Sequence, residues 1–574
     1  PVLSTFPYGA VQLLPGALKR QFDENHAFFL HLSEDRMLKI YRQRSGLPAP
    51  GRDMGGWYDD FCPGAHFGQY LSALARFAAA TGSEPTRAKV QRLVRGYGQT
   101  VDPTGKFFVD LRYPGYTYDK LVIGLLDAKT WAGDDNAIPV LYATTTAARP
   151  HMADRALTPE EMHALPHKDE TYTWDETYTL AENLFIAWER TGDRMFFDMA
   201  RRYLLDRTFF DPLSRGENVL AGLHAYSHVN ALSSGLQGYM KLGDRKYYQA
   251  VVNAVDMIWK DQSFATGGWG PNEAFVEPGK GQLGASLSDT HRSFETPCGA
   301  YAHFKAMRYL MALTVDPRYG DSMERVLYNT ILGAWDVRDD GSSFYYSDYH
   351  HSGSKTYRRE IPGAEYRWDK DARWPCCSGT LPQIAADYTI SAYFRAADGV
   401  YVNLYVPSRL TWAPGCSMVT ETQYPTDNLV RMTMALAAPK EFALYVRVPA
   451  WAGPQSSVSI NGARLKGGLT AGTFLQLRRE WKKGDLVELD LDQRLRTEPV
   501  DGQNPDQVAL MRGPQVLFAI AQDQPRIARA QLERAALARA ANHDWNLKLE
   551  NSDLLLRPFY DIGPEVYQTY IRVT

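Results

Sequence analysis

Three of the five cysteines of this 574-residue chain fall into two short segments. Cys376 and Cys377 are adjacent, and Cys298 follows Glu295 by three residues. Zinc accepts both thiolates and carboxylates, so three thiols and one carboxylate make a four-ligand set. Adjacent cysteines rarely bridge each other, because a disulfide needs a geometry that neighbours reach only with strain. The spacing therefore predicts zinc or thiol chemistry, with buried and inert cysteines as the alternative.

The pattern differs from that of most structural zinc sites. Those sites usually pair two CxxC segments, whereas this chain combines ExxC with two adjacent cysteines. The difference favours a site that performs chemistry over one that only holds the fold.

A further carboxylate, Glu273, lies in a Gly-rich segment, residues 267–275, upstream of these residues. Apolar neighbours such as Trp269 and Phe275 raise the pKa of a carboxyl group, as a general acid requires at neutral pH. The alternative is a loop glutamate that is only solvated.

Composition limits the classes of partner. Basic and acidic residues nearly balance, 63 against 66, so no nucleic-acid partner is expected. The chain has no apolar run of 18 residues, so no membrane span is expected. The chain opens at Pro1 without an initiator Met. If a signal peptide was removed, the expected compartment is periplasmic or secreted, and otherwise it is cytoplasmic. A homodimer stays an open option.

Helical periodicity dominates residues 1–395, where pairs of apolar helical runs are separated by short turns that contain Gly or Asp. About six such hairpins fit this length, which predicts an (α/α)6 barrel. From residue 396 the period changes to two, and strands such as 400–406 and 442–448 predict a β-sandwich over 396–524. The remaining residues, 525–574, are expected to form an Ala- and Arg-rich helix over 526–541 and strands that complete the β region.

Several segments carry a resemblance along nearly the whole chain. They are Glu295 with Cys298, the run 325–333, the run 376–380, the run 401–408, the Gly-rich turn with Glu273, and the shorter matches 445–451, 481–484 and 512–514. Together they resemble the β-L-arabinofuranosidase group of glycoside hydrolases, families 127 and 146, formerly domain of unknown function 1680.

The resemblance implies a retaining exo-hydrolase that releases a β-L-arabinofuranose-like sugar from a carbohydrate substrate. By position, Cys376 would be a zinc-bound nucleophile, and Glu295, Cys298 and Cys377 would complete the zinc site. Glu273 would act as the general acid and then as the general base. Four residues match positions at which the family contacts sugar, and ordinary loop packing is the alternative for each: His66, Gln69, His228 and Tyr346.

Two departures from the family pattern affect these expectations. The family usually has one residue between the zinc Glu and its Cys, whereas two stand between Glu295 and Cys298 here, so this ligand is the least secure. The family commonly has a His in the segment that corresponds to residues 116–120 here, which contain none. Another active-site segment of the family appears here as residues 178–183. Both changes would alter the polarity of the pocket. A glycone other than plain β-L-arabinofuranose is therefore an open alternative.

Two rival functions come from different classes. One is a metal-independent hydrolase or lyase on the same barrel that uses Asp175, Glu176 or Glu182. The other is a non-catalytic sugar-binding protein in which zinc is structural. Replacing Cys376 would leave the first rival active, and stripping the metal would unfold the second.

Overall fold

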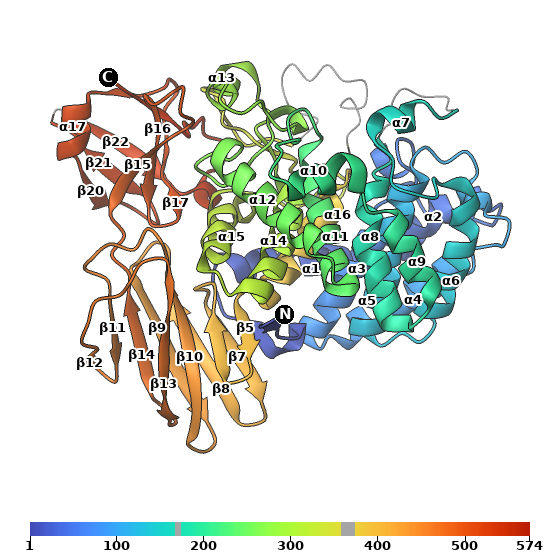
Figure 1. Cartoon of the computed structure of the whole chain (residues 1–574), viewed down its shortest axis with the longest axis horizontal. Helices are drawn as coiled ribbons and strands as arrows, with labels where there is room; N and C mark the ends of the chain where they lie inside the picture. The colour runs from blue at the N-terminus through green and yellow to red at the C-terminus, as the bar shows by residue number, and fades with distance from the viewer. Residues whose placement is uncertain (167–173, 358–372, 551) are drawn as a thin grey trace.

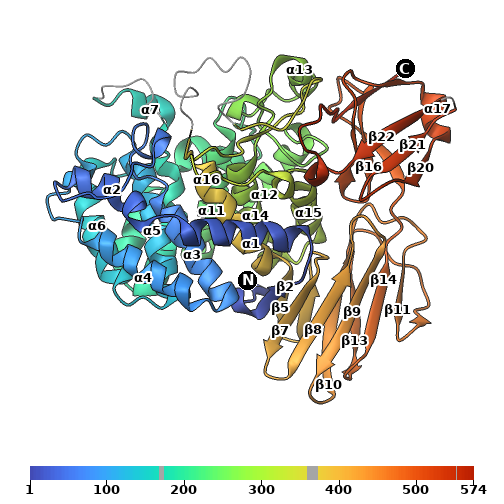
Figure 2. The ribbon, with the colours of Figure 1, turned by 180° about the vertical axis from the view of Figure 1, so that it is seen from behind.

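The computed structural model describes residues 1–166, 174–357, 373–550 and 552–574. Six helices form an inner ring in which each helix packs against the next, and α16 packs against α3, so that the ring closes. The inner helices are α3 (Phe67–Thr81), α5 (Pro114–Ala132), α8 (Leu180–Thr191), α11 (Ala225–Leu242), α14 (Thr296–Thr314) and α16 (Cys377–Ser391). Figures 1 and 2 show the ring from opposite sides.

A second helix covers each inner helix from outside, which completes an (α/α)6 barrel as predicted. In the same order, the outer helices are α4 (Glu84–Gly98), α6 (Ala137–Ala148), α9 (Arg194–Arg202), α12 (Arg245–Asp261), α15 (Pro317–Asn329) and α1 (Ala17–His31). Shorter helices lie in the connections: α2 (Glu34–Arg44), α7 (Pro159–His163), α10 (Asp211–Ser214) and α13 (Gln282–Asp289).

The predicted turns end the inner helices. Four inner helices stop at a glycine in the left-handed region, namely Gly82, Gly133, Gly192 and Gly243. The fifth, α14, stops at Val315 with φ 61°, a conformation that is strained for a β-branched residue. An aspartate then caps the next outer helix at Asp193, Asp244 and Asp316.

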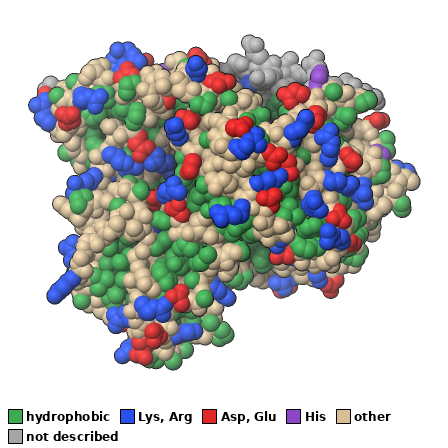
Figure 3. Space-filling view, viewed as in Figure 1, with side chains coloured by type: hydrophobic (Ala, Val, Ile, Leu, Met, Phe, Trp, Pro, Cys, Tyr) green, Lys and Arg blue, Asp and Glu red, His purple; other side chains and the backbone are tan. Residues whose placement is uncertain are grey.

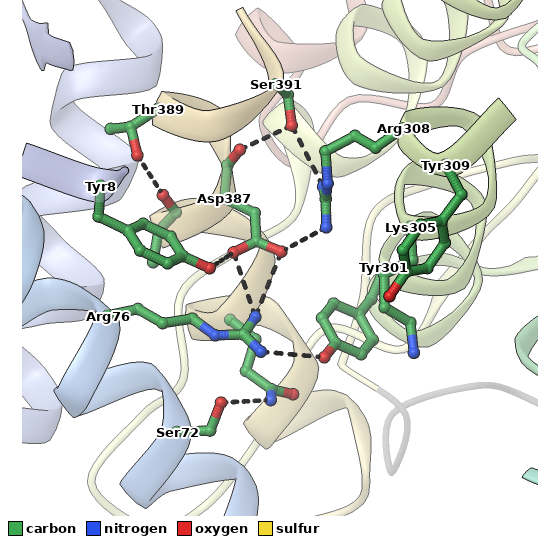
Figure 4. A network of polar contacts seen from close by, with 12 residues as sticks. Tyr8, Ser72, Arg76, Tyr301, Lys305, Arg308, Tyr309, Asp387, Thr389 and Ser391 are labelled. Atoms are coloured by element: carbon green, nitrogen blue, oxygen red, sulfur yellow. Dashed lines mark hydrogen bonds and ion pairs between the residues drawn. The ribbon is translucent and has the colours of Figure 1, made fainter. Parts of the chain in front are cut away.

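A buried network of charged side chains ties together the inner helices (Figure 4). Asp387 of α16 accepts hydrogen bonds from Arg308 of α14 at 2.9 Å and from Arg76 of α3 at 3.1 Å. Arg76 also pairs with Asp127 of α5 at 2.9 Å, and Tyr8 donates to Asp387 at 2.7 Å. Because each charge has a partner, the barrel interior can hold them without a large desolvation penalty.

Two sheets form the middle domain. The first, in spatial order, contains β1 (Ser4–Thr5), β5 (Tyr393–Ala396), β6 (Gly399–Val402), β10 (Lys440–Val448) and β13 (Thr473–Trp481). The second contains β12 (Ala463–Arg464), β11 (Ser457–Ile460), β14 (Leu486–Asp490), β9 (Leu429–Leu436), β8 (Cys416–Thr422), β7 (Ser408–Ala413) and β2 (Val11–Leu13). The chain's first strands thus belong to this domain, next to strands from beyond residue 392.

Two further sheets form the C-terminal domain, beside α13 and α15 in Figure 1. One contains β15 (Leu495–Pro499), β16 (Gln507–Arg512), β23 (Ile571–Val573) and β19 (Arg526–Ile527), with β17 (Gln515–Val516) paired to β16. The other contains β18 (Phe518–Ala519), β22 (Asp553–Arg557), β21 (Trp545–Lys548) and β20 (Ala536–Arg539). These sheets begin upstream of residue 525.

The helix expected over 526–541 is wrong in its length. Only α17 (Arg529–Arg534) is helical, and β20 follows it. Leu537 pairs with Leu547 of β21, so the pairing of strands overrides the helical preference of the Ala-rich sequence.

Charged side chains of both signs alternate over the visible face of the barrel, in accord with the near balance of charge (Figure 3). Within the described ranges, no helix is long and apolar enough to cross a membrane.

Candidate active site and metal centre

Two neighbouring inner helices begin at the same place and carry the predicted ligands. Glu295 is the N-cap residue of α14, and Cys298 lies in its first turn. Cys376 is the N-cap residue of α16, and Cys377 is the first residue of that helix. Helix N-termini carry a partial positive charge, which favours carboxylates and thiolates there. The additional residue before Cys298 lies in the first turn of α14, so Glu295 still reaches the thiols.

The four donor atoms of Glu295, Cys298, Cys376 and Cys377 all lie within 4.8 Å of one another, and all four residues are buried. The sulfurs of Cys377 and Cys298 are 3.5 Å apart, and Cys376 Sγ is 3.4 Å from Glu295 Oε1. From the usual bond lengths, a tetrahedral zinc site has S–S edges of about 3.8 Å and S–O edges of about 3.6 Å. The group therefore has the size of a metal site and could hold a metal ion.

The acidic groups of this cluster also favour a bound metal ion. Burial raises the pKa of Glu295, and the neighbouring Cys376 and Glu273 raise it further. Burial also raises the pKa of Cys298 and Cys377. For Cys376 burial acts in the same sense, but hydrogen bonds from Cys298 and Cys377 outweigh it and lower its pKa. Three thiols and a carboxyl group in one buried place cannot all ionise unless a cation compensates their charge.

Glu273 lies on a strained turn beside the cluster. Both Asn272 and Glu273 have positive φ, 54° and 65°, which is rare for residues other than glycine and typical of functional sites. The turn is held by pairing of Ala274 with His224, and the Tyr346 hydroxyl donates to Glu273 Oε1.

His224, the N-cap of α11, stands between the two carboxylates. Its Nε2 is 3.6 Å from Glu273 Oε2 and 3.7 Å from Glu295 Oε2. Burial opposes protonation of this ring, but Glu273 and Glu176 outweigh it and raise the pKa of His224. Among the described residues, neither His224 Nε2 nor Glu295 Oε2 has a hydrogen-bond partner, although both atoms are buried. A substrate hydroxyl or a water would satisfy both.

A pocket opens onto this cluster at the end of the barrel. Aromatic rings make up most of its wall, which suits the apolar face of a sugar ring. The lining residues are Trp57, Phe61, Cys62, Tyr113, Tyr116, Trp174, Glu176, His224, Tyr226, Glu295, Tyr345 and Cys376. Glu273 is not among them, but its Oε2 lies 3.6 Å from Nε2 of His224, which is.

None of the four predicted sugar contacts is among the described lining residues of this pocket. His66 Nε2 is 3.4 Å from the hydroxyl of Tyr116, a wall residue. Gln69 packs against Gly379, where an added Cβ would come within 2.5 Å of the amide oxygen. His228 stacks on Tyr178 at 4.5 Å and contacts the carbonyl of His224. His66 and His228 thus contact residues of the pocket wall, and Tyr346 contacts Glu273. A direct contact with sugar stays a prediction for all four.

The two titratable pocket residues His224 and Glu176 had no part in the predicted site: the sequence analysis gave His224 no chemical role and named Glu176 only for the metal-independent alternative. His224 and His228 are one helical turn apart, and only the first reaches the pocket. A histidine just before an expected helix start is the signal that could have singled out His224, because helix N-termini face the pocket here.

Three carboxylates belong to the metal-independent alternative. Asp175 accepts N–H groups of Gly115 and Tyr116 at 3.2 and 2.7 Å, so it caps α5. Glu182 is buried and forms an ion pair with Lys305. Only Glu176 lines the pocket, 3.5 Å from His224 Nδ1, and burial raises its pKa to about 7.

Comparison with known proteins identifies the family. The model of the β-L-arabinofuranosidase GH127 catalytic domain matches residues 10–389, and the model of the GH127 middle domain matches residues 399–493. The chain therefore belongs to the GH127 β-L-arabinofuranosidase family and is a glycoside hydrolase. The expected family and enzyme class are confirmed.

Solved structures share the whole architecture. The GH127 β-L-arabinofuranosidase Ara127N from Geobacillus stearothermophilus T6 is 18% identical, with a TM-score of 0.73 over 98% of this chain and 100% of that one. The GH127 β-arabinofuranosidase BT3674 is also 18% identical, with a TM-score of 0.73 over 100% of this chain and 98% of that one. At this identity the likeness establishes the fold. No curated protein matches the chain.

Proposed function

We propose that the protein is a retaining exo-hydrolase that releases a β-L-arabinofuranose-like sugar from glycans or glycoconjugates. In this proposal Cys376 is the nucleophile, Glu273 is the acid and base, and zinc is held by Glu295, Cys298, Cys376 and Cys377. One observation carries the proposal: Cys376 belongs to the four-donor cluster and also lines the aromatic pocket. A purely structural metal site would have no reason to place a thiol in the wall of a pocket lined by aromatic rings.

The first step forms a bond between the sugar and the enzyme. Cys376 Sγ attacks the anomeric carbon while Glu273 gives its proton to the leaving oxygen, so the C–S bond forms as the C–O bond breaks. Zinc, when bound, keeps the Cys376 thiol deprotonated. In the second step Glu273 takes a proton from water, whose oxygen attacks the same carbon and releases the thiolate. Two inversions give retention of configuration.

Other residues position the substrate and stabilise the charge of the Cys376 thiolate. His224 lies between Glu273 and Glu295, and its Nε2, which has no hydrogen-bond partner among the described residues, can bind a sugar hydroxyl. Tyr345 has its hydroxyl 3.8 Å from Cys376 Sγ and can stabilise the thiolate by donating to it. In this proposal Tyr346, His66 and His228 support Glu273, Tyr116 and His224 in turn, and Gln69 packs against Gly379 in the first turn of α16.

Glu176 is the specific alternative to Glu273 as the acid, since it lines the pocket and its raised pKa suits proton donation near pH 7. In both versions the thiol remains the nucleophile.

Cys376→Ser and Cys376→Ala test the proposal against the metal-independent enzyme and the sugar-binding protein. Turnover of chromogenic furanosides and pyranosides, zinc content and circular dichroism are measured for the parent and for both variants. We expect both variants to lose turnover by about 10³-fold or more while they remain folded. Full activity in both would remove the nucleophile, and binding without turnover in the parent would favour a binding protein.

A further inference from the structure

The family matches end at residue 493, so they give no role to the C-terminal domain. One of its segments, residues 567–570 just before β23, contacts two loops of the barrel. We name this segment the C-terminal strap. The tyrosine loop, residues 343–357, carries Tyr345 and Tyr346, and the acid loop, residues 263–275, carries Glu273.

We propose that the C-terminal strap is a positioning element of the active site, with Tyr567 setting the tyrosine loop and Tyr570 setting the acid loop. This inference rests on the proposed function only where it names the catalytic consequence.

Tyr567 binds the tyrosine loop at two points. Its buried hydroxyl donates to the carbonyl of Asp348 at 2.6 Å, and its backbone N–H donates to the carbonyl of Gly353 at 2.9 Å. Next to it, the side-chain amide of Gln568 donates to the carbonyl of His351 at 2.5 Å. These bonds fix the loop just after Tyr345 and Tyr346.

Tyr570 binds the acid loop instead. Its hydroxyl, on a side chain that is 1% exposed, accepts the N–H of Ala265 at 2.8 Å. The loop folds back on itself through the N–H of Phe264, which donates to the carbonyl of Gly268 at 2.8 Å. The strained turn at Glu273 follows directly, so the anchored end lies eight residues before the proposed acid.

The two loops also bond to each other, and the tyrosine loop pairs with the strand that contains Glu295, the proposed zinc ligand. Thr266 of the acid loop donates to the Tyr349 hydroxyl of the tyrosine loop at 2.7 Å. Strand β4 (Tyr346–Ser347) pairs with β3 (Phe294–Glu295), which places Glu295 directly opposite Tyr346. A shift of the strap would therefore reach Tyr345, Glu273 and Glu295 together.

The docking surface is close-packed and contains a buried lysine. Lys355 of the tyrosine loop is 5% exposed, and its Nζ lies 4.4 Å from the ring centre of Phe559 in the C-terminal domain. Gly268 has no room for a side chain, since a Cβ there would lie 2.8 Å from the Phe294 ring. Close packing transmits small displacements, and a misplacement of about 1 Å can cost about 100-fold in rate.

Tyr567→Phe and Tyr570→Phe each remove one strap hydroxyl from the full chain. Tyr203→Phe is the matched control for Tyr567→Phe, because the Tyr203 side chain is also buried and its hydroxyl also donates to a backbone carbonyl, that of Ala153, at 2.6 Å. Hydrogen exchange of peptides from both loops is measured together with kcat, KM and circular dichroism.

We expect Tyr567→Phe to speed exchange about 5-fold in the tyrosine loop and Tyr570→Phe to do so in the acid loop, while Tyr203→Phe changes neither. Both strap variants should lose about 10-fold in kcat with KM changed less than about 2-fold. Unchanged loop exchange in both strap variants, or equal effects in Tyr203→Phe, overturns the inference. If the parent hydrolyses no glycoside, the proposed function fails, and the exchange measurement still decides on the strap.

Discussion

Asp387 makes the most informative target for stability, because three side chains converge on one buried carboxylate. Arg76, Arg308 and Tyr8 all donate to it, and the side chain is only 1% exposed. Asp387→Asn keeps the shape and removes the charge. Arg76 then retains Asp127, but Arg308 has no other acidic partner among the ion pairs of the described residues.

Breaking a buried ion pair by changing one partner costs about 3–5 kcal/mol, since it leaves a charge without compensation. We expect Asp387→Asn to fall in this range. In a domain of this size the midpoint temperature should drop by roughly 5 °C. Unfolding in urea and on heating is measured by tryptophan fluorescence.

The control is Asp23→Asn, which breaks the exposed pair with Lys19. Such a surface pair should change stability by less than about 1 kcal/mol. If Asp387→Asn destabilises the protein no more than Asp23→Asn does, the network does not hold the inner helices together and the reasoning is refuted.

Three further predictions concern the proposed general acid, the metal site and the surface at which the C-terminal domain packs on the barrel. Glu273→Gln should lower kcat by about 10²–10⁴ on poor leaving groups and far less on a nitrophenyl glycoside, whereas Glu176→Gln should lack this dependence; the reverse pattern makes Glu176 the acid. Dialysis against a zinc chelator should abolish turnover, with recovery on adding zinc, and full activity at less than a tenth of a zinc per chain would contradict the metal assignment. Burial lowers the pKa of Lys355 from 10.5 to about 7. At a pH between these two pKa values the lysine is neutral in the folded protein and takes up a proton on unfolding. The free energy of unfolding should therefore rise from pH 7 to 10. Lys355→Met should flatten that rise and stabilise the protein at pH 7 by about 1–3 kcal/mol; an unchanged pH slope would argue against a buried neutral lysine.

Local signals in the sequence predicted the barrel well. In a Gly-Asp turn such as Gly192-Asp193, the glycine ends one helix and the aspartate caps the next, so the pair predicts a helical hairpin directly. Closure of the ring depends on α16 packing against α3, a contact between distant segments that no local pattern reveals. Strands β1 and β2 were not predicted, because two or three residues carry no periodicity.

The candidate site shows the same division. The cysteines and Glu295 could be grouped from the sequence, since each lies at a helix start and their chemistry is distinctive. The position of His224 just before the start of α11 was an available signal for that residue. Whether His228, one turn later, also faces the pocket depends on how α11 is rotated in the ring, which the sequence does not reveal. The role of Tyr567 depends on contacts across more than 200 residues of sequence.

The central claim is that the sugar becomes bonded to a thiol, and the place of that bond can be measured directly. The enzyme is quenched with acid during turnover of a slow furanoside, digested, and its peptides are mapped by mass. The account predicts a pentose mass on the peptide that contains Cys376, absent in Cys376→Ala. A sugar on Glu176 or Glu273, or inverted product with no adduct on any peptide, would contradict it.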